Sequence, residues 1–368
     1  MTRILTPSSV EELVDDVRST PYLLAVGAGT KLRLSAVDCV KVSATKLSGI
    51  LEYEPSEFTF TALAGTPIHA VAATLAERGQ YLPFDPMLAE AGATLGGTVA
   101  SGLSGPGRFR FGGLRDFILA VRFVDGAGRL LRMGGKVVKN AAGFDVPKFF
   151  VGSLGRFGVL AEITFKVFPR HASMLTLLLN AKTPETAVQI LTQAASGRWE
   201  IDALDWLPDA PYVAARLVGP EESLDPLADE ILKRWSGEKL NTADANARWA
   251  SLSEFSWAST SIARKTSTET TLLLKVPTIP EVVAPLRQVV ETLGGKVHVS
   301  SGGSVAYAAF DSATDIAVVD AKFRALKLSS LTLRGNVPLW LGSRNNTTIA
   351  TAVKNALDAE NRFPNLAD

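Results

Sequence analysis

The residues of this chain whose types and spacing could do chemistry lie in two short glycine-rich segments. Residues 27–31 read Gly-Ala-Gly-Thr-Lys directly after an apolar run, and residues 93–102 read Ala-Thr-Leu-Gly-Gly-Thr-Val-Ala-Ser-Gly. Glycine lets backbone N–H groups approach an anion closely, so both segments could bind phosphate. Neither has the complete dinucleotide fingerprint or the P-loop sequence, so tight turns without a ligand remain an alternative.

Positive charge gathers around the second of these segments. Residues 101–170 include 12 Lys or Arg and 4 Asp or Glu residues, whereas the whole chain has a net charge of +1. This basic excess favours a ligand that carries phosphate groups. It coincides with glycines rather than with a basic helix or an aromatic stacking surface, so we do not expect a nucleic-acid partner.

Histidine and cysteine are too few, and too far apart in sequence, to indicate a metal site. The single cysteine, Cys39, excludes an internal disulfide and an iron–sulfur centre built by this chain alone. The histidines are His69, His171 and His298, and no two have the spacing of metal ligands. We therefore expect no metal, and we interpret Cys39 as a small apolar strand residue and His298 as a packed or solvated residue.

The composition is that of a globular protein with two domains. The chain has 368 residues, of which 46% are hydrophobic and 20% are charged. It contains no run of about 20 uncharged apolar residues. Its first residues lead into acidic ones where a secretory signal would have an apolar core. These features predict a cytoplasmic protein without a transmembrane segment.

The pattern of apolar residues predicts an α+β fold. In the first half we expect helices at residues 10–17 and 68–78 and strands at residues 22–26, 39–42, 49–54, 59–64, 117–124 and 159–167. The second half alternates short strands with helices at residues 184–195, 221–235, 280–293 and 313–326, joined by a link at residues 241–255. This alternation predicts an antiparallel sheet with helices on one face, followed by a last helix at residues 346–359.

Several motifs then carry a resemblance, because they occur together in a fixed order. They are GAGTK, LEYEP, LPFDP, GATLGGTVASGLSGPGRFRFGGLRDF and, from residue 139, KNAAGFD. In this order they resemble the FAD-binding domain of the vanillyl-alcohol-oxidase or PCMH type, and within it the smaller FAD-binding subunits of bacterial glycolate oxidases. The resemblance implies a two-lobed PCMH-type FAD-binding domain at residues 1–172, a ferredoxin-like α/β cap domain at residues 173–337 and a tail at residues 338–368 that returns to the FAD domain.

The same resemblance assigns the cofactor site. The residues that it places at FAD are Gly27, Ala28, Gly29, Thr30, Lys31, Pro83, Ala93, Thr94, Gly96, Gly97, Ala100, Ser101, Gly102, Gly143, Gly152, Gly155, Gly158 and Val159. Some relatives attach FAD covalently through a histidine or cysteine in these loops, and neither residue type is present in them here. The resemblance therefore implies non-covalent FAD.

The activity implied is that of an FAD-dependent oxidoreductase acting on CH–OH groups, as a subunit of a complex that oxidises glycolate to glyoxylate. Related catalytic subunits carry a His-x-His type metal motif in the cap, whereas His298 stands alone. We therefore expect the flavin of this chain to relay electrons. The implied partners are a larger catalytic FAD subunit and an iron–sulfur subunit, through which the chain could be held peripherally at the inner membrane.

Two other functions stay open. One is an autonomous FAD-dependent oxidase or dehydrogenase of a small hydroxy compound, with Arg334, Lys139 or Tyr307 as the acid–base group and Arg334 as the candidate carboxylate anchor. The other is a structural subunit that has lost its flavin. The docking of the tail is also open, because its ending, Asp-Ala-Glu-Asn-Arg-Phe-Pro from residue 358, differs from the family pattern.

Overall fold

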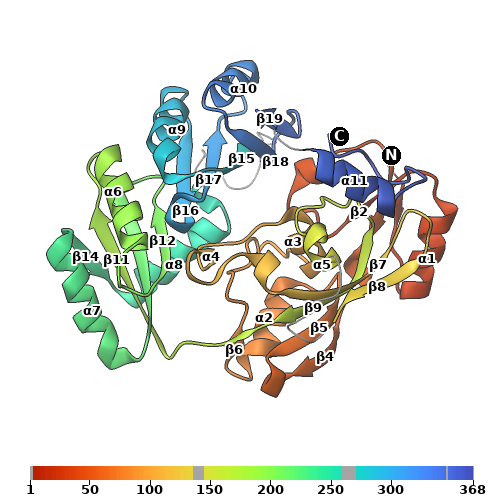
Figure 1. Ribbon diagram of the computed structural model, residues 1–368, viewed down its shortest axis with the longest axis horizontal. Coiled ribbons are helices and arrows are strands. Elements are labelled where there is room, and N and C mark those ends of the chain that lie inside the picture. The colour runs from red at the N-terminus through yellow and green to blue at the C-terminus, as the bar shows by residue number, and fades with distance from the viewer. Residues whose placement is uncertain (1–2, 136–144, 259–270, 345–346, 368) are drawn as a thin grey trace. The chain divides into compact units, whose positions relative to one another are not determined.

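The computed structural model describes residues 3–135, 145–258, 271–344 and 347–367, which form two compact units (Figure 1). The first unit contains residues 1–104, 113–170 and 346–368. The second contains residues 105–112 and 171–345. The second unit thus includes a short segment from the middle of the sequence expected for the FAD domain, and it also includes residues 338–345, which we had expected in the tail.

The first unit begins with a three-stranded parallel sheet in the order β1-β3-β2. Helix α1 (Val10–Ser19) connects two of its strands, and Ser9 caps the helix by accepting the N–H of Glu12 at 3.1 Å. The helix buries Leu13 and Val17. The strands are β1 (Ile4–Leu5), β2 (Leu23–Val26) and β3 (Val40–Ser43), so the first glycine-rich segment leaves the sheet directly at the end of β2.

A second sheet of the first unit is antiparallel and has five strands in the order β4-β5-β9-β7-β8. Its strands are β4 (Ile50–Glu54), β5 (Thr59–Leu63), β7 (Ile118–Val124), β8 (Leu130–Gly134) and β9 (Val159–Lys166). The short strands β6 (Gln80–Tyr81) and β10 (Phe168–Pro169) pair with each other. The helices of this part are α2 (Ile68–Ala76), α3 (Leu95–Ser101) and α5 (Val146–Phe150).

The second unit contains one antiparallel sheet of nine strands, built from two similar halves. The first half is β11 (Ser173–Asn180), α6 (Pro184–Ala195), β12 (Ile201–Trp206), β13 (Tyr212–Gly219), α7 (Glu221–Arg234) and β14 (Gly237–Leu240). The second is β15 (Leu272–Pro277), α9 (Pro280–Thr292), β16 (Lys296–Ser300), β17 (Val305–Phe310), α10 (Ile316–Ala325) and β18 (Ser329–Arg334). Each half has the ferredoxin-like order of elements, and β12 joins β16 through the pair Trp206 and Val299.

Helices cover one face of this nine-stranded sheet. The core contains Leu274, Val299 and Ala306 from the strands, together with Val283 and Ile190 from the helices. Side chains alternate between the two faces of a strand, so the residues next to these point to the opposite face. We call the residues Asp205, Lys275, His298, Ser300 and Tyr307 on that opposite face the polar row, because strand pairing sets Tyr307 opposite both Lys275 and His298.

Two segments that we expected to be irregular form helices. Residues 95–101 form α3 although they include Gly96 and Gly97, and Thr94 caps this helix by accepting the N–H of Gly97. The expected link at residues 241–255 contains α8 (Thr242–Ser253), which Asn241 caps. The remaining elements include the strand β19 (Trp340–Gly342) at the sheet edge, the helices α4 (Arg108–Phe111) and α11 (Thr348–Leu357), and the short 3-10 turns η5 (Ser256–Ala258) and η6 (Ser301–Gly303).

The C-terminal tail packs within the first unit, although its sequence is altered. The N–H of Leu23 donates to the carbonyl of Arg362 at 2.8 Å, and Phe363 is buried in the core with Leu13 and Val17. The guanidinium of Arg362 donates to the carbonyls of Val17, Arg18 and Thr20 at the end of α1. The tail therefore holds the end of α1 and the start of β2, which leads to the first glycine-rich segment.

Candidate cofactor site

Two adjacent cavities lie between the first glycine-rich segment and α3. The first has a volume of about 60 Å³ and the second about 40 Å³, and they share Ala25, Val26, Gly27, Thr94, Gly97 and Ala100. Pockets that hold large ligands measure roughly 300–1,000 Å³, so each cavity could hold only part of a dinucleotide. Together they form a cradle at the end of β2.

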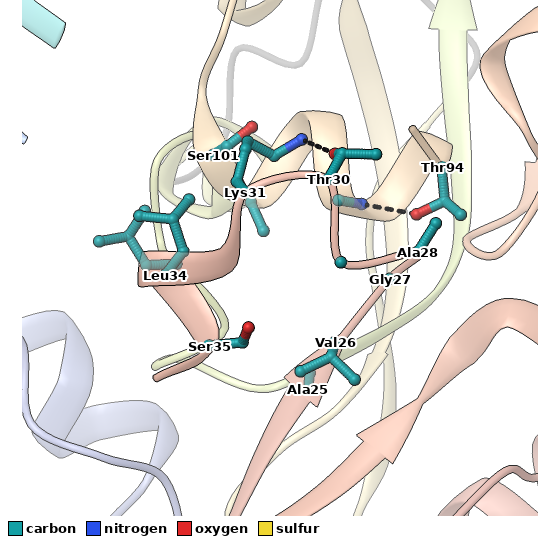
Figure 2. A pocket seen from close by; sticks show the side chains of 14 residues that line it. Ala25, Val26, Gly27, Ala28, Thr30, Lys31, Leu34, Ser35, Thr94 and Ser101 are labelled. Carbon is teal, nitrogen blue, oxygen red and sulfur yellow. Dashed lines mark hydrogen bonds between the residues drawn. The ribbon is translucent and has the colours of Figure 1, made fainter. Parts of the chain in front are cut away.

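Gly27 brings the two glycine-rich segments into contact. A Cβ atom at this position would lie 2.4 Å from Oγ1 of Thr94, so only glycine fits here. Two residues later, Gly29 has a φ of +74°, and no atom lies within 4 Å of the place where its Cβ would be. Figure 2 shows residues 27–31 passing beside Thr94 at the start of α3. The segment is therefore anchored on one side and open on the other.

The backbone N–H groups of the two segments differ in what they can still bind. At the start of α3, Leu95 donates to the carbonyl of Thr66 at 2.9 Å and Gly96 donates to that of Ala64 at 2.7 Å. The N–H of Gly97 donates to Thr94 Oγ1 (Figure 2). In contrast, no acceptor among the described residues receives the N–H groups of residues 28–30. The anion-binding backbone groups are thus those of the first segment, whereas the sequence suggested both.

Lys31 adds a cation to this segment. Its Nζ donates a hydrogen bond to Thr30 Oγ1 at 2.9 Å, and burial lowers the pKa of the Lys31 ammonium group to about 8 (Figure 2). Within the ranges that the structure describes, no carboxylate forms an ion pair with Lys31. A half-buried ammonium group beside open N–H groups is well suited to neutralise a diphosphate.

The second cavity has an apolar wall. Ala44, Ala64, Val159 and Leu160 line it, together with Gly155, whose Cβ would lie 3.0 Å from the carbonyl oxygen of Ala25. Small and aliphatic side chains of this kind suit the flat surface of a ring system. A cationic, N–H-rich cavity beside an apolar one fits the diphosphate and ring parts of FAD, so the residues present are compatible with this cofactor.

Most of the residues that the sequence assigned to the cofactor line these cavities. They are Gly27, Ala28, Gly29, Thr30, Lys31, Thr94, Gly96, Gly97, Ala100, Ser101, Gly155, Gly158 and Val159. Pro83, Ala93, Gly102 and Gly152 line neither cavity, and Gly143 lies outside the described residues. Ala93 instead links a turn to the start of α2, since its N–H donates to the carbonyl of Leu88 and its carbonyl accepts the N–H of Ile68.

Other lining residues were missed by sequence reasoning. They are Ala25, Val26, Leu34, Ser35, Ala44, Ala64, Ser153, Leu154 and Leu160. Ala25 and Val26 could have been found, because the last residues of a strand stand next to the loop that follows it. Ala44 directly follows β3 and Ala64 directly follows β5, and only the folding of the sheets brings them to the cavity.

His298 in the second unit is a packed residue with a specific partner. It is 1% exposed, and its Nε2 lies 2.8 Å from Oδ2 of Asp205. Its other ring nitrogen, Nδ1, is buried and has no hydrogen-bond partner in the part of the chain that the structure describes, and the rings of Trp257 and Tyr307 lie against the imidazole. The interpretation as a packed residue agrees with this environment, but the Asp205 carboxylate could not be foreseen.

The residues named for an autonomous oxidase are in different situations. Arg334 lies at the end of β18 opposite Leu273, and burial lowers the pKa of its guanidinium. Tyr307 is 1% exposed, and burial raises the pKa of its hydroxyl well above the usual range. Lys139 lies outside the described residues.

The described residues show neither a metal-binding cluster nor a membrane-spanning helix. No three His, Cys, Asp or Glu side chains there are grouped so that they could hold a metal ion. Among the same residues, every helix is too short or too polar to cross a lipid bilayer.

The first part of the chain is similar to known proteins. Residues 2–134 match the family model described as an FAD binding domain. The chain is 42% identical over 156 residues to glycolate oxidase subunit GlcE of Escherichia coli, a match covering 42% of this chain and 43% of that protein. It is 30% identical over 170 residues to a D-lactate dehydrogenase of Anaerostipes hadrus, covering 45% of this chain and 35% of that protein. The match therefore spans less than half of each of these relatives.

The fold is shared over nearly the whole chain. A solved structure of alkyldihydroxyacetonephosphate synthase superposes with a TM-score of 0.69 at 15% identity, covering 98% of this chain and 76% of that one. At this identity the likeness concerns the fold alone. The cradle described above lies in the region that matches the family model, apart from its residues 153–160. Residues 2–134 are thus similar to an FAD binding domain, on a chain with the fold of alkyldihydroxyacetonephosphate synthase.

Proposed function

We propose that this chain is the FAD-binding subunit of a complex that oxidises glycolate to glyoxylate. The observation that carries the proposal is the 42% identity over 156 residues to glycolate oxidase subunit GlcE. Similarity to glycolate oxidase subunit GlcD of Bacillus subtilis, 27% identical over 152 residues, supports the same assignment. The flavin supplies a two-electron acceptor for the C–H bond of a hydroxy acid, and the protein supplies binding and orientation.

The residues of the cradle would hold the cofactor without a covalent bond. Lys31 and the N–H groups of residues 28–30 face the diphosphate charge, while Ala44, Ala64 and Val159 exclude water from the rings. The described residues that line the two cavities include no histidine, cysteine or tyrosine to which a flavin could be attached. Acid precipitation of the protein should therefore release the flavin into the supernatant.

The flavin of this chain would relay electrons rather than oxidise the acid itself. A base must take the hydroxyl proton, and the imidazole on the polar row, His298, shares Nε2 with Asp205 and has Nδ1 buried. The catalytic partner would be a larger FAD subunit. An iron–sulfur subunit would accept the electrons, because Cys39 alone cannot hold a cluster. The complex would be cytoplasmic, with any membrane contact made through the partners.

A second candidate follows from the similarity to D-lactate dehydrogenases. The 30% identity over 170 residues to the Anaerostipes hadrus protein favours an FAD-dependent dehydrogenase that acts alone on a small 2-hydroxy acid. Turnover of D-lactate or glycolate by the purified chain would support this alternative.

The test of the proposed function is a reconstitution of the complex. The larger FAD subunit and the iron–sulfur subunit are purified without this chain, and glycolate-dependent reduction of a dye is measured before and after the chain is added. We expect the rate to rise only with the wild-type chain and not with Gly97→Val, which alters the cradle. An equal rate without the chain would contradict the proposal.

A further inference from the structure

A groove on the second unit lies outside the cofactor cradle. It has a volume of about 600 Å³ and lies where α4 approaches the turn between β16 and β17. The groove is lined by three segments. They are α4, with Arg108 and Arg110, the η6 turn, with Ser301 and Gly302, and the residues around the start of α9, among them Thr278. All of these residues belong to the second unit.

Arg108 brings a cation into this groove. No ion pair or hydrogen bond to any described residue engages its guanidinium. The neighbouring Arg110 differs, because its guanidinium donates to the carboxylate of Glu200 at 2.6 Å and to the carbonyl of Glu200 at 2.9 Å. Of the two arginines, only Arg108 keeps its donors for a ligand.

The position of Arg108 is fixed by the residue that follows it. The ring of Phe109 packs on Gly302, where a Cβ atom would lie 2.6 Å from the ring. Gly302 also has a φ of +64°, which favours glycine. This close approach holds α4 against the η6 turn, so Arg108 and Ser301 line the same groove.

Ser301 contributes an unused donor to the groove. The residue is 7% exposed, and its buried hydroxyl has no hydrogen-bond partner among the described residues. Its N–H donates to Asp205 Oδ1 at 2.9 Å. A buried hydroxyl without a partner costs free energy, and a ligand acceptor would remove that cost.

The neighbourhood of Arg108 is positive rather than neutral. Burial, and to a smaller extent the charge of Arg108, lower the pKa of Lys275 to about 8, so the two cations lie near each other. The charge of Arg108 also acts on the buried hydroxyl of Tyr307. Asp205 is the carboxylate of the polar row, but it already accepts from Ser300 Oγ and from the Ser301 N–H, and it pairs with His298. Arg108 and Lys275 are thus two neighbouring cations, and the nearby carboxylate of Asp205 already has other hydrogen-bond partners. A bound anion would stabilise such a site.

We propose that this groove binds a small carboxylate anion, with Arg108 as its main anchor and the Ser301 hydroxyl as a second donor. The proposed function, on which this step rests, names the anion as glycolate or its oxidised product. Arginine presents a planar pair of N–H groups that matches a carboxylate. The groove supplies this anchor for the carboxylate but no base for the hydroxyl proton. The imidazole considered for that role, His298, has its Nδ1 enclosed by Trp257 and Tyr307. The chain thus binds the acid and leaves its oxidation to the partner subunit.

The experiment is calorimetric titration of the full-length, FAD-loaded chain with sodium glycolate, and separately with glycolamide, which lacks the carboxylate. We expect glycolate to bind at least about tenfold more tightly than glycolamide, and Arg108→Ala to weaken glycolate binding by about tenfold or more. Arg108→Lys keeps the charge but loses the planar pair of N–H groups. Its affinity for glycolate should lie between those of the wild type and Arg108→Ala. Ser301→Ala should weaken binding by a few fold.

Arg198→Ala is the matched control, since it removes an arginine of the same unit that does not line the groove and whose charge Glu230 already neutralises. It should change glycolate affinity by less than about threefold. Equal binding of glycolate by Arg108→Ala and the wild type would overturn the inference, as would equal binding of glycolamide or no binding of glycolate at all. Sulfate that competes as well as glycolate would reduce the groove to a non-selective anion site and would also overturn it. Calorimetry tests the groove, and the reconstitution assay tests the proposed function. A failure of one can therefore be told from a failure of the other.

Discussion

Gly96 and Gly97 are adjacent, yet the structure gives them different roles. A Cβ on Gly96 would lie 2.9 Å from the Cβ of Ala64 and 3.0 Å from its carbonyl oxygen, so Gly96 allows α3 to pack on β5. A Cβ on Gly97 would lie 3.0 Å from Thr94 Oγ1 alone, and Gly97 lines both cavities. Side chains at these positions should therefore affect different properties of the protein.

We predict that Gly97→Val lowers FAD affinity by at least about tenfold, because its side chain occupies the cradle and displaces Thr94. The unfolding free energy should change little. Gly96→Val should instead lower the free energy of unfolding by about 1–3 kcal/mol through overpacking against β5. Flavin content and urea unfolding of both variants test this contrast, and full flavin occupancy in Gly97→Val would show that the cradle is elsewhere.

Lys31 should make FAD binding depend on pH. Its pKa is lowered to about 8 in the cofactor-free structure, and a bound diphosphate would raise it again. Below about pH 8 the ammonium is charged in both states, so affinity is constant there. As the pH rises above about 8, the free protein loses the proton first, and affinity should fall by up to about tenfold per pH unit until the bound state also titrates.

Fluorescence titration of FAD between about pH 7 and pH 10 measures this dependence. Lys31→Met should bind FAD more weakly at pH 7 and show no fall in this window. Lys46→Met is the control, because Lys46 is exposed and does not line the cradle, and it should behave like the wild type. Identical pH profiles for Lys31→Met and the wild type would contradict the role of Lys31.

At the scale of elements, the tail depends on a buried ion pair. Lys354 of α11 is 4% exposed and pairs with Asp358, which is 1% exposed. The Lys354 ammonium also donates to the carbonyl of Phe363 at 3.0 Å, and the Asp358 carboxylate accepts the N–H groups of Arg362 and Phe363. These bonds form the turn that carries Phe363 into the core of the first unit.

Lys354→Met should lower the free energy of unfolding by about 3–5 kcal/mol, because it leaves the Asp358 carboxylate buried without a cation. Asn355→Ala, an exposed change in the same helix, should lie within about 0.5 kcal/mol of the wild type. Urea unfolding followed by circular dichroism gives both values. A loss below about 1 kcal/mol in Lys354→Met would mean that the tail does not stabilise the first unit.

Elements with strong local signals could be predicted from the sequence. Helix α6 begins and ends at the predicted residues, since Thr183 caps it and Pro184 opens it. Helix α3 was missed because its paired glycines are typical of a loop. Helix α8 was missed although Asn241 caps it and Ala245, Trp249 and Leu252 give a buried stripe. Small and polar residues surround this stripe in the sequence, which made it hard to recognise.

The candidate sites were predictable only where they are local in sequence. The segment 27–31 follows its strand directly, so its place at the cradle could be inferred. The pair of Asp205 and His298 joins residues 93 positions apart through the contact of β12 with β16. The groove at Arg108 likewise depends on a segment of the first half of the chain that packs with the second unit. A single sequence contains no local signal for either.

At the scale of the whole molecule, the two units contain different candidate sites. The first unit contains most of the residues that match the FAD binding domain, together with the cradle and Lys31. The second contains the polar row, whose imidazole is enclosed, and the groove with Arg108. This division supports a subunit that binds flavin and acid but passes the chemistry to a partner.

The most direct test of this account is anaerobic mixing with glycolate, followed through the visible absorbance of the flavin. The isolated chain and the reconstituted complex are compared at equal flavin concentration. We predict that glycolate bleaches the flavin of the complex and leaves that of the isolated chain oxidised over the same time. Bleaching of the isolated chain at a rate comparable to the complex would contradict the account and would make this chain the catalytic subunit.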